Sequence, residues 1–109
     1  MISWSDFEKL DIRIGTIIEA KPFEKAGKPA YKLTIDFGEM GIKNSSAQIT
    51  ALYKLEELID KQIIAIINFP PKQIADFMSE CLVLGVYNEH KEVILLQPER
   101  KTANGNKIG

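Results

Sequence analysis

The chain has 109 residues, a formal net charge of −1 and 45% hydrophobic residues. This length predicts one domain, and the density of apolar residues excludes a disordered chain. The balanced charge excludes a protein-wide basic field, so any nucleic-acid binding would need a local basic surface.

The first residues predict a short helix. Ser3 or Ser5 can cap a helix over residues 3–10, in which Trp4 and Phe7 would pack as a lid on the domain or against a partner. The chain starts without the basic and apolar regions of a signal peptide, and no apolar run reaches the roughly 18 residues of a membrane helix. A cytoplasmic protein without membrane insertion is expected.

Two alternating strands follow, at residues 11–21 and 31–37. The first is expected to bury the apolar side chains of its alternating pattern, namely Ile12, Ile14, Ile18 and Ala20. Gly15 in mid-strand indicates a sharp bend or a close approach of another backbone. The second strand alternates more regularly and is typical of a half-buried antiparallel strand.

A third strand, at residues 42–49, is unusually polar. Its polar side chains either face a ligand or are simply solvated. Apolar residues at three- and four-residue spacing then predict a helix over 51–60, with Thr50 as a plausible cap. The apolar, β-branched run 63–67 predicts the central strand.

Residues 68–80 form a long connection to two more strands, near 81–87 and 92–96. A plain hairpin would need only about two to five residues. A longer loop that holds Pro70 and Pro71 on a rigid sheet is where binding residues are usually found. Cys81, the only cysteine, excludes a disulfide framework within one chain and is expected to be a small buried hydrophobe.

The order of these elements predicts an all-β fold. It is a five-stranded OB-fold barrel with one helix between strands 3 and 4, a short N-terminal helix and a C-terminal extension. The binding face of such a barrel lies over strands 2 and 3 and the adjoining loops.

Several segments resemble a known family over essentially the whole chain. They are 11–17, 31–38, 45–49, Asn68-Phe69-Pro70-Pro71, Ser79-Glu80 with 82–84, and 104–108. This is similar to the tRNA-binding domain family, the OB-fold module appended to many methionyl-tRNA synthetases. Within it, the chain looks most like stand-alone members described as secretion-related chaperones. Those members form homodimers, which implies dimerisation extensions at 1–10, with Trp4 and Phe7, and at 97–109 of a single domain, 1–109.

The family's RNA-contacting surface implies a set of contact residues here: Lys32, Lys43, Ser45, Ser46, Gln48, Asn68, Lys72, Ser79 and Glu80. For Asn68 and Glu80 an alternative stays open, in which each side chain holds backbone instead. Phe77 and Met78 lie in the long loop and are expected to be exposed, where they would contact bases or apolar peptide side chains. Phe69, at the end of the central strand, is expected in the core.

Two residues depart from the family pattern. Asp76 stands where the family usually has Gly, and Met78 where it usually has a basic residue. An added acid and a lost base should weaken attraction for phosphate. The hairpin loop that holds His90 shows no metal-ligand spacing, and the chain has no Gly-rich phosphate loop.

The sequence therefore predicts no enzyme, metal or cofactor. The expected function is a homodimeric tRNA-binding protein with export-related chaperone activity, whose partners are tRNA and unfolded or export-destined polypeptides. The alternative is a purely RNA-binding module that acts in trans on tRNA or on a synthetase, without a chaperone role.

Overall fold

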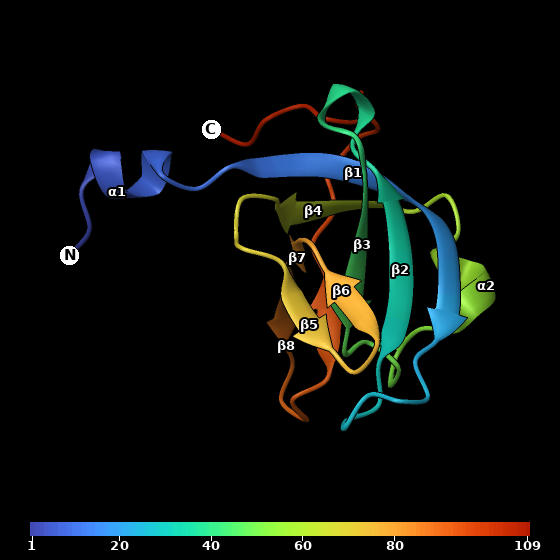
Figure 1. Ribbon diagram of the computed structural model, residues 1–109. Coiled ribbons are helices and arrows are strands. Elements are labelled where there is room, and N and C mark those ends of the chain that lie inside the picture. The colour runs from blue at the N-terminus through green and yellow to red at the C-terminus, as the bar shows by residue number, and fades with distance from the viewer.

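The computed structural model describes residues 1–109 and is mostly β-structure (Figure 1). Its elements are α1 (Trp4–Glu8), β1 (Ile12–Pro22), β2 (Tyr31–Asp36), η1 (Gly38–Met40), β3 (Ile42–Ala47), α2 (Leu55–Leu58), β4 (Gln62–Ile66), β5 (Lys72–Ile74), β6 (Phe77–Ser79), β7 (Leu82–Val83), β8 (Gly85–Tyr87) and β9 (Val93–Leu95). Five antiparallel strands form one sheet in the order β3-β2-β1-β4-β7. This sheet curls into a nearly closed barrel, which confirms the predicted OB-type fold.

The interior of the barrel is filled by side chains from the inward faces of these strands and from α2. The largest fully buried ones include Phe37, Ile17, Leu33, Ile35, Leu58 and Ile63. Gly15 is part of this packing, because a Cβ atom added there would lie 2.6 Å from both Ile35 Cγ2 and Phe37 Cε1. The predicted close approach at Gly15 is therefore real, and core side chains rather than another backbone make it.

The buried face of β1 differs from the prediction after residue 16. Ile12 and Ile14 are buried as expected, but Ile18 is exposed and Ile17 is fully buried. The pairing of β1 with β2 shifts register between Ile17 and Glu19, which marks a β-bulge. Ile17 lies before this bulge, opposite Ile35, and shares a face of β1 with Gly15. This face packs into the main core cluster, whereas Ile12 and Ile14 are buried on the opposite face, outside that cluster.

The predicted helix over 51–60 is only partly present. Residues 51–54 form a turn and an extended stretch, and α2 covers only Leu55–Leu58. Its cap is Lys54, whose backbone amide donates to Glu57 Oε1 at 2.7 Å, and not Thr50. None of the helices combines the length and the apolar character that crossing a membrane requires.

The long connection 68–80 is not an open loop, because it folds into the hairpin β5–β6. Lys72 pairs with Ser79 and Ile74 with Phe77. Ala75 turns the chain with a positive φ of 53°, a left-handed conformation that residues with a side chain adopt uncommonly. Figure 1 shows this hairpin lying across the open side of the barrel, in front of β3 and β7.

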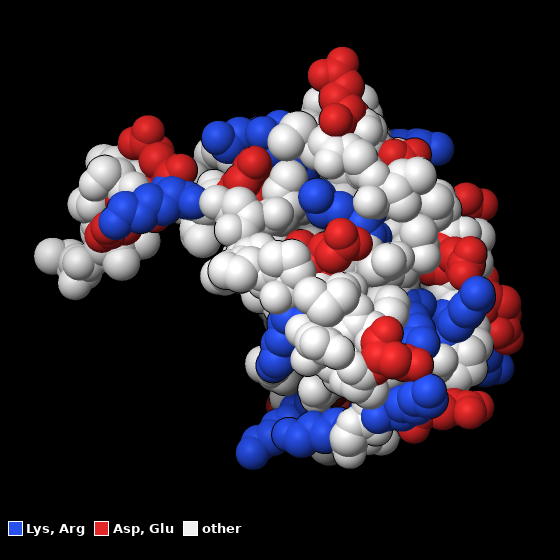
Figure 2. All heavy atoms as spheres, in the orientation of Figure 1, with Lys and Arg blue, Asp and Glu red and all other residues white.

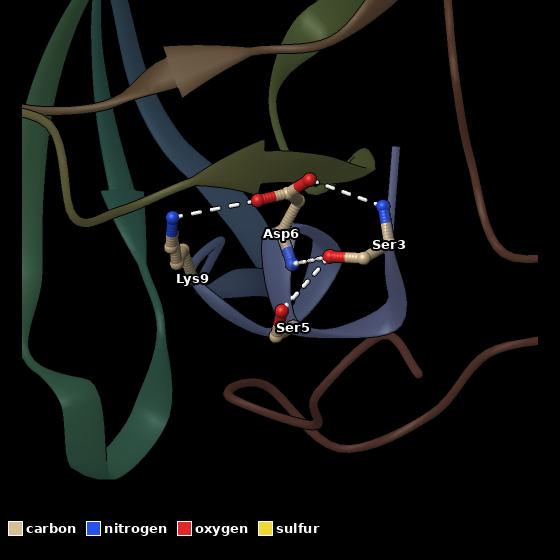
Figure 3. A network of polar contacts seen from close by, with 4 residues as sticks. All are labelled: Ser3, Ser5, Asp6 and Lys9. Carbon is tan, nitrogen blue, oxygen red and sulfur yellow. Dashed lines mark hydrogen bonds and ion pairs between the residues drawn. The ribbon is translucent and has the colours of Figure 1, made fainter. Parts of the chain in front are cut away.

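The helix α1 projects from the barrel and is held mainly by its own polar groups (Figure 3). Ser3 is the cap: Ser3 Oγ accepts from the Asp6 amide at 3.2 Å, and Asp6 Oδ2 accepts from the Ser3 amide at 3.0 Å. The Ser3 amide, and then the Ser3 hydroxyl and Lys9, lower the pKa of the Asp6 carboxyl group. Trp4 is 84% exposed, so it is not a lid on its own barrel, whereas Phe7 is half-buried.

The C-terminal residues run along β1 as an additional, irregular strand. The amide of Ile14 donates to Asn106 O, Gly105 donates to Ile14 O, and Ile108 donates to Ile12 O, at 2.7 to 3.0 Å. Backbone pairing thus satisfies polar groups that would otherwise form a free sheet edge. The tail is anchored to its own barrel.

Candidate nucleic-acid interface

The outer face of β2 and β3 gathers part of the predicted contact set. Lys32 on β2 lies directly opposite Ser46 on β3. Gln48, two residues further along, is exposed just beyond the end of the strand. Lys43 is an odd number of residues from Ser46 and therefore lies on the side of β3 that carries the buried Ser45. The predicted lysines therefore do not all converge on one face.

Lys32 is held in place by two aromatic rings. Its Nζ atom lies 4.8 Å from the centroid of the Phe23 ring and 5.3 Å from that of Phe77. The two rings meet edge to face, with centroids 5.3 Å apart and an interplanar angle of 63°. Attraction between a cation and a ring face orients the ammonium group and leaves it charged. Phe23 was missed by the sequence reasoning, because its neighbouring prolines and glycine indicated only a turn.

The hairpin β5–β6 presents Lys72 and Met78 to solvent. At its tip, Asp76 Oδ2 accepts a hydrogen bond from Lys25 Nζ at 2.9 Å. This bond lowers the pKa of Asp76 and raises that of Lys25. The acid that departs from the family pattern is therefore paired with a base, so the hairpin is less negative than the sequence suggests.

Ser79 and Glu80 hold the hairpin on the barrel. Ser79 Oγ accepts from the Ser46 amide at 3.1 Å. Glu80 Oε1 accepts from the Asn44 amide at 2.9 Å, and the Glu80 amide donates to Asn44 O at 2.8 Å. The sequence left two roles open for Glu80, an RNA contact or a bond to backbone. In the structure its carboxylate bonds backbone.

Ser45 lies inside the barrel and is fully buried. Its hydroxyl donates to Cys81 O at 3.0 Å and so joins β3 to the segment that precedes β7. A ligand outside the barrel cannot reach it, so the prediction of Ser45 as an RNA contact is wrong for this fold. Burial raises the pKa of the Cys81 thiol to about 11, although Ser45 and Lys43 oppose this shift. The thiol stays protonated at neutral pH, as expected of a buried small hydrophobe.

Asn68 also bonds backbone, but not in its own loop. Its Nδ2 donates to Lys9 O at 2.7 Å, and its Oδ1 accepts from the Asp11 amide at 2.9 Å. Both polar atoms of the side chain are thus engaged by the segment that links α1 to β1. Asn68 therefore fixes where this segment leaves the barrel. Its side chain holds backbone, as in the alternative considered from the sequence, but the backbone belongs to Lys9 and Asp11.

A cavity of about 360 Å³ lies between the start of the hairpin and β7. It is lined by Phe69, Pro70, Lys72, Ser79, Glu80, Cys81 and Leu82. Phe69 is 48% exposed here and is not in the core, because the chain turns outward at the end of β4. Leu82 is equally exposed and was not singled out from the sequence, where it lay within an apolar run. The cavity offers apolar surface beside the Lys72 ammonium group.

Charge on this side of the molecule is distributed in small groups. Figure 2 shows Lys and Arg side chains around a largely uncharged central surface, with Asp and Glu interspersed. This agrees with the net charge of −1. The site can therefore contact phosphates at a few points, while most of its area is polar or apolar.

Comparison with known proteins places the chain in a family. Residues 12–107 match the family model described as "Putative tRNA binding domain". The chain is 37% identical over 108 residues to the methionine–tRNA ligase of Methanococcoides burtonii, covering 99% of the chain but 16% of the ligase. It therefore spans about a sixth of the length of the curated relatives that it matches.

Solved structures of two CsaA proteins are among those that match the whole chain. The chaperone CsaA of Bacillus anthracis has a TM-score of 0.95 at 53% identity, covering 100% of this chain and 99% of that one. The CsaA chaperone protein of Picrophilus torridus has a TM-score of 0.94 at 56% identity, with both chains covered completely. These matches confirm the resemblance found from the sequence motifs. The chain belongs to the tRNA-binding domain family.

Proposed function

We propose that this protein binds tRNA as a homodimer in the cytoplasm and also binds unfolded, export-destined polypeptides as a chaperone, without catalysing a reaction. The observation that carries the proposal is the match of residues 12–107 to a tRNA-binding family, together with likeness to CsaA chaperones over the full chain. The same residues fold into an OB-type barrel, a scaffold that binds oligonucleotides.

The tRNA contacts that we propose are Lys32, Ser46, Gln48 and Lys72, with Lys43 on the other side of β3. Lys32 is pre-oriented by Phe23 and Phe77, and Lys72 is exposed on the hairpin. Ser79, Glu80 and Asn68 would act indirectly, because their side chains hold backbone.

Replacement of both Lys32 and Lys72 by alanine is expected to weaken tRNA binding and flatten its salt dependence. Each lost phosphate contact lowers the slope of log K against log salt concentration by about 1. Filter-binding titrations with total tRNA at several salt concentrations measure this. The matched control is Lys54→Ala, which removes one exposed lysine beside α2. Equal slopes for the double variant and the control would contradict the proposed contacts, and absent binding to the folded wild type at low salt would overturn tRNA binding itself.

The chaperone part is supported by exposed apolar surface beside the proposed RNA contacts. Phe69, Leu82 and Met78 are each nearly half exposed, and the first two line the cavity of about 360 Å³. Near-stoichiometric protein is expected to suppress aggregation of a denatured client, measured by light scattering. Aggregation that is indifferent to the protein would leave the alternative, a purely RNA-binding module that acts in trans on tRNA or a synthetase.

The homodimer is supported by the two ends of the chain. The N- and C-terminal segments lie on the same side of the barrel, and α1 projects from it (Figure 1). Trp4 and Ile2 are 84% and 77% exposed, so a second copy would bury apolar surface there. The extensions 1–10 and 97–109 are the proposed contacts. Sedimentation velocity tests this, and a monomer at micromolar concentration would contradict it.

A further inference from the structure

The edge of β3 that faces away from β2 is only partly paired. Along its first half, the main chain of Asn44 bonds the amide and carboxylate of Glu80. Ser46 continues in the same direction and donates its amide to Ser79 Oγ. Residues two apart present their main-chain groups to the same side of a strand, so Gln48 is the next to face this edge.

Gln48 has no main-chain partner. Neither its amide nor its carbonyl takes part in any hydrogen bond of the structure, and the same holds for Ile49. The Gln48 side chain is exposed, so nothing covers the edge at this point. An open strand edge is a template for another extended chain, because unpaired amides and carbonyls there accept a new strand.

A groove of about 410 Å³, with both polar and apolar lining, runs beside this open edge, between the end of β3 and the strands β7 and β8. Seven of its eleven lining residues are hydrophobic, among them Ile49, Val83, Leu84, Tyr87 and Val93. Lys91 is the one charged residue of the lining. A single cation offers little to a phosphate backbone, whereas apolar walls beside free main-chain groups suit a polypeptide. Leu82 lines both this groove and the cavity beside Phe69, so the two apolar sites adjoin.

We propose that this groove binds an extended segment of polypeptide, which adds as a strand to the edge of β3 at Gln48. Main-chain hydrogen bonds to Gln48 extend the pairing that Ser79 and Glu80 begin. Alternate apolar side chains of the bound segment enter the groove, and Lys91 favours an acidic residue at one end. The inference rests on the proposed polypeptide binding and specifies its site and mode.

A scan of N-methylated peptides tests the mode with the unmodified protein. The probe is a fluorescent eight-residue peptide that alternates valine and threonine and ends in glutamate, with either alternate set of its amides methylated. Strand addition predicts that methylation of one set weakens binding about tenfold or more, since it removes the peptide donors that face the edge and leaves their acceptors unpaired. The other set should bind like the unmethylated peptide. Equal effects of the two sets would overturn strand addition.

The matched variants are Gln48→Pro and Gln48→Ala. Proline removes the main-chain donor at an exposed position that uses it for no internal bond, whereas alanine removes only the side chain. Gln48→Pro is expected to bind the peptide about tenfold more weakly and Gln48→Ala like wild type. Equal affinity of the two folded variants would contradict the groove. If Gln48→Pro does not fold, the methylation scan with the unmodified protein tests the inference instead.

Three further results separate this inference from the proposed function. If wild type suppresses aggregation but the methylation scan is flat, only the groove is wrong. If wild type neither suppresses aggregation nor binds the peptide, polypeptide binding itself fails. If Gln48→Pro alone abolishes the dimer, the groove belongs to a second copy, and the inference is overturned.

Discussion

Replacement of Gly15 by alanine is expected to lower the free energy of unfolding by about 1–3 kcal/mol, the usual cost of adding volume to a packed core. The added Cβ would lie 2.6 Å from Ile35 Cγ2 and from a carbon of the Phe37 ring. Both side chains are fully buried, so neither can move aside without displacing others. The loss is a large fraction of the total, because a domain of this kind is stabilised by only about 5–15 kcal/mol.

Urea unfolding followed by circular dichroism measures this effect. Gly27→Ala is the matched control, since no heavy atom lies within 4 Å of the Cβ position there. The control should unfold at the wild-type midpoint or slightly above it, because alanine restricts the unfolded chain. A Gly15→Ala protein with the wild-type midpoint would show that the core can relax around the methyl group.

Replacement of Glu80 by alanine is expected to cost about 1–3 kcal/mol of stability, because it leaves a partly buried donor unsatisfied. That donor is the Asn44 amide, whose partner is Glu80 Oε1 at 2.9 Å. The same change removes one of the three hydrogen bonds that hold the hairpin β5–β6 on the edge of β3, so tRNA and peptide binding should fall with stability. Glu80→Gln retains an oxygen that can accept from Asn44 and should remain close to wild type.

The pair of variants also tests the RNA contact that the sequence predicted at Glu80. If the carboxylate read a base, Glu80→Gln would unfold like wild type but change the preference among RNA sequences. Unfolding curves and binding to a set of tRNAs separate these results. Loss of stability in Glu80→Ala alone, with unchanged RNA preference in Glu80→Gln, is the expected outcome.

The order of strands and helices along the chain, and from it the fold, was predictable because it depends on local sequence patterns. Strands that bury one face alternate apolar and polar residues, as Tyr31–Asp36 does. The position of α2 between β3 and β4 then selects the OB-type barrel. Gly15 was also informative, because a glycine in mid-strand often marks a bend or a place where other atoms approach the backbone closely.

The site was less predictable because its side chains are engaged by distant backbone. Asn68 bonds Lys9 and Asp11, and Glu80 bonds Asn44 36 residues away in sequence. No local pattern encodes such partners. The burial of Ile17 in place of Ile18 was missed for a similar reason, since Ile17 is placed in the main core by its pairing with Ile35 on β2. Lys32 lies on the outer face as predicted, but the rings that orient it lie in a turn and a hairpin whose folding was not foreseen.

The pairing of the C-terminal residues with β1 has a consequence for how the protein is made. Arg13 Nη1 donates to Gly105 O, 92 residues along the chain, so β1 leaves the ribosome long before its partner does. This edge of β1 stays unpaired until residues 105–108 have been added, at about 5–20 residues per second. Contacts between residues so far apart in sequence form slowly. Completion of the barrel therefore waits until residues 105–108 have been made, and this edge of β1 is open to mispairing until then.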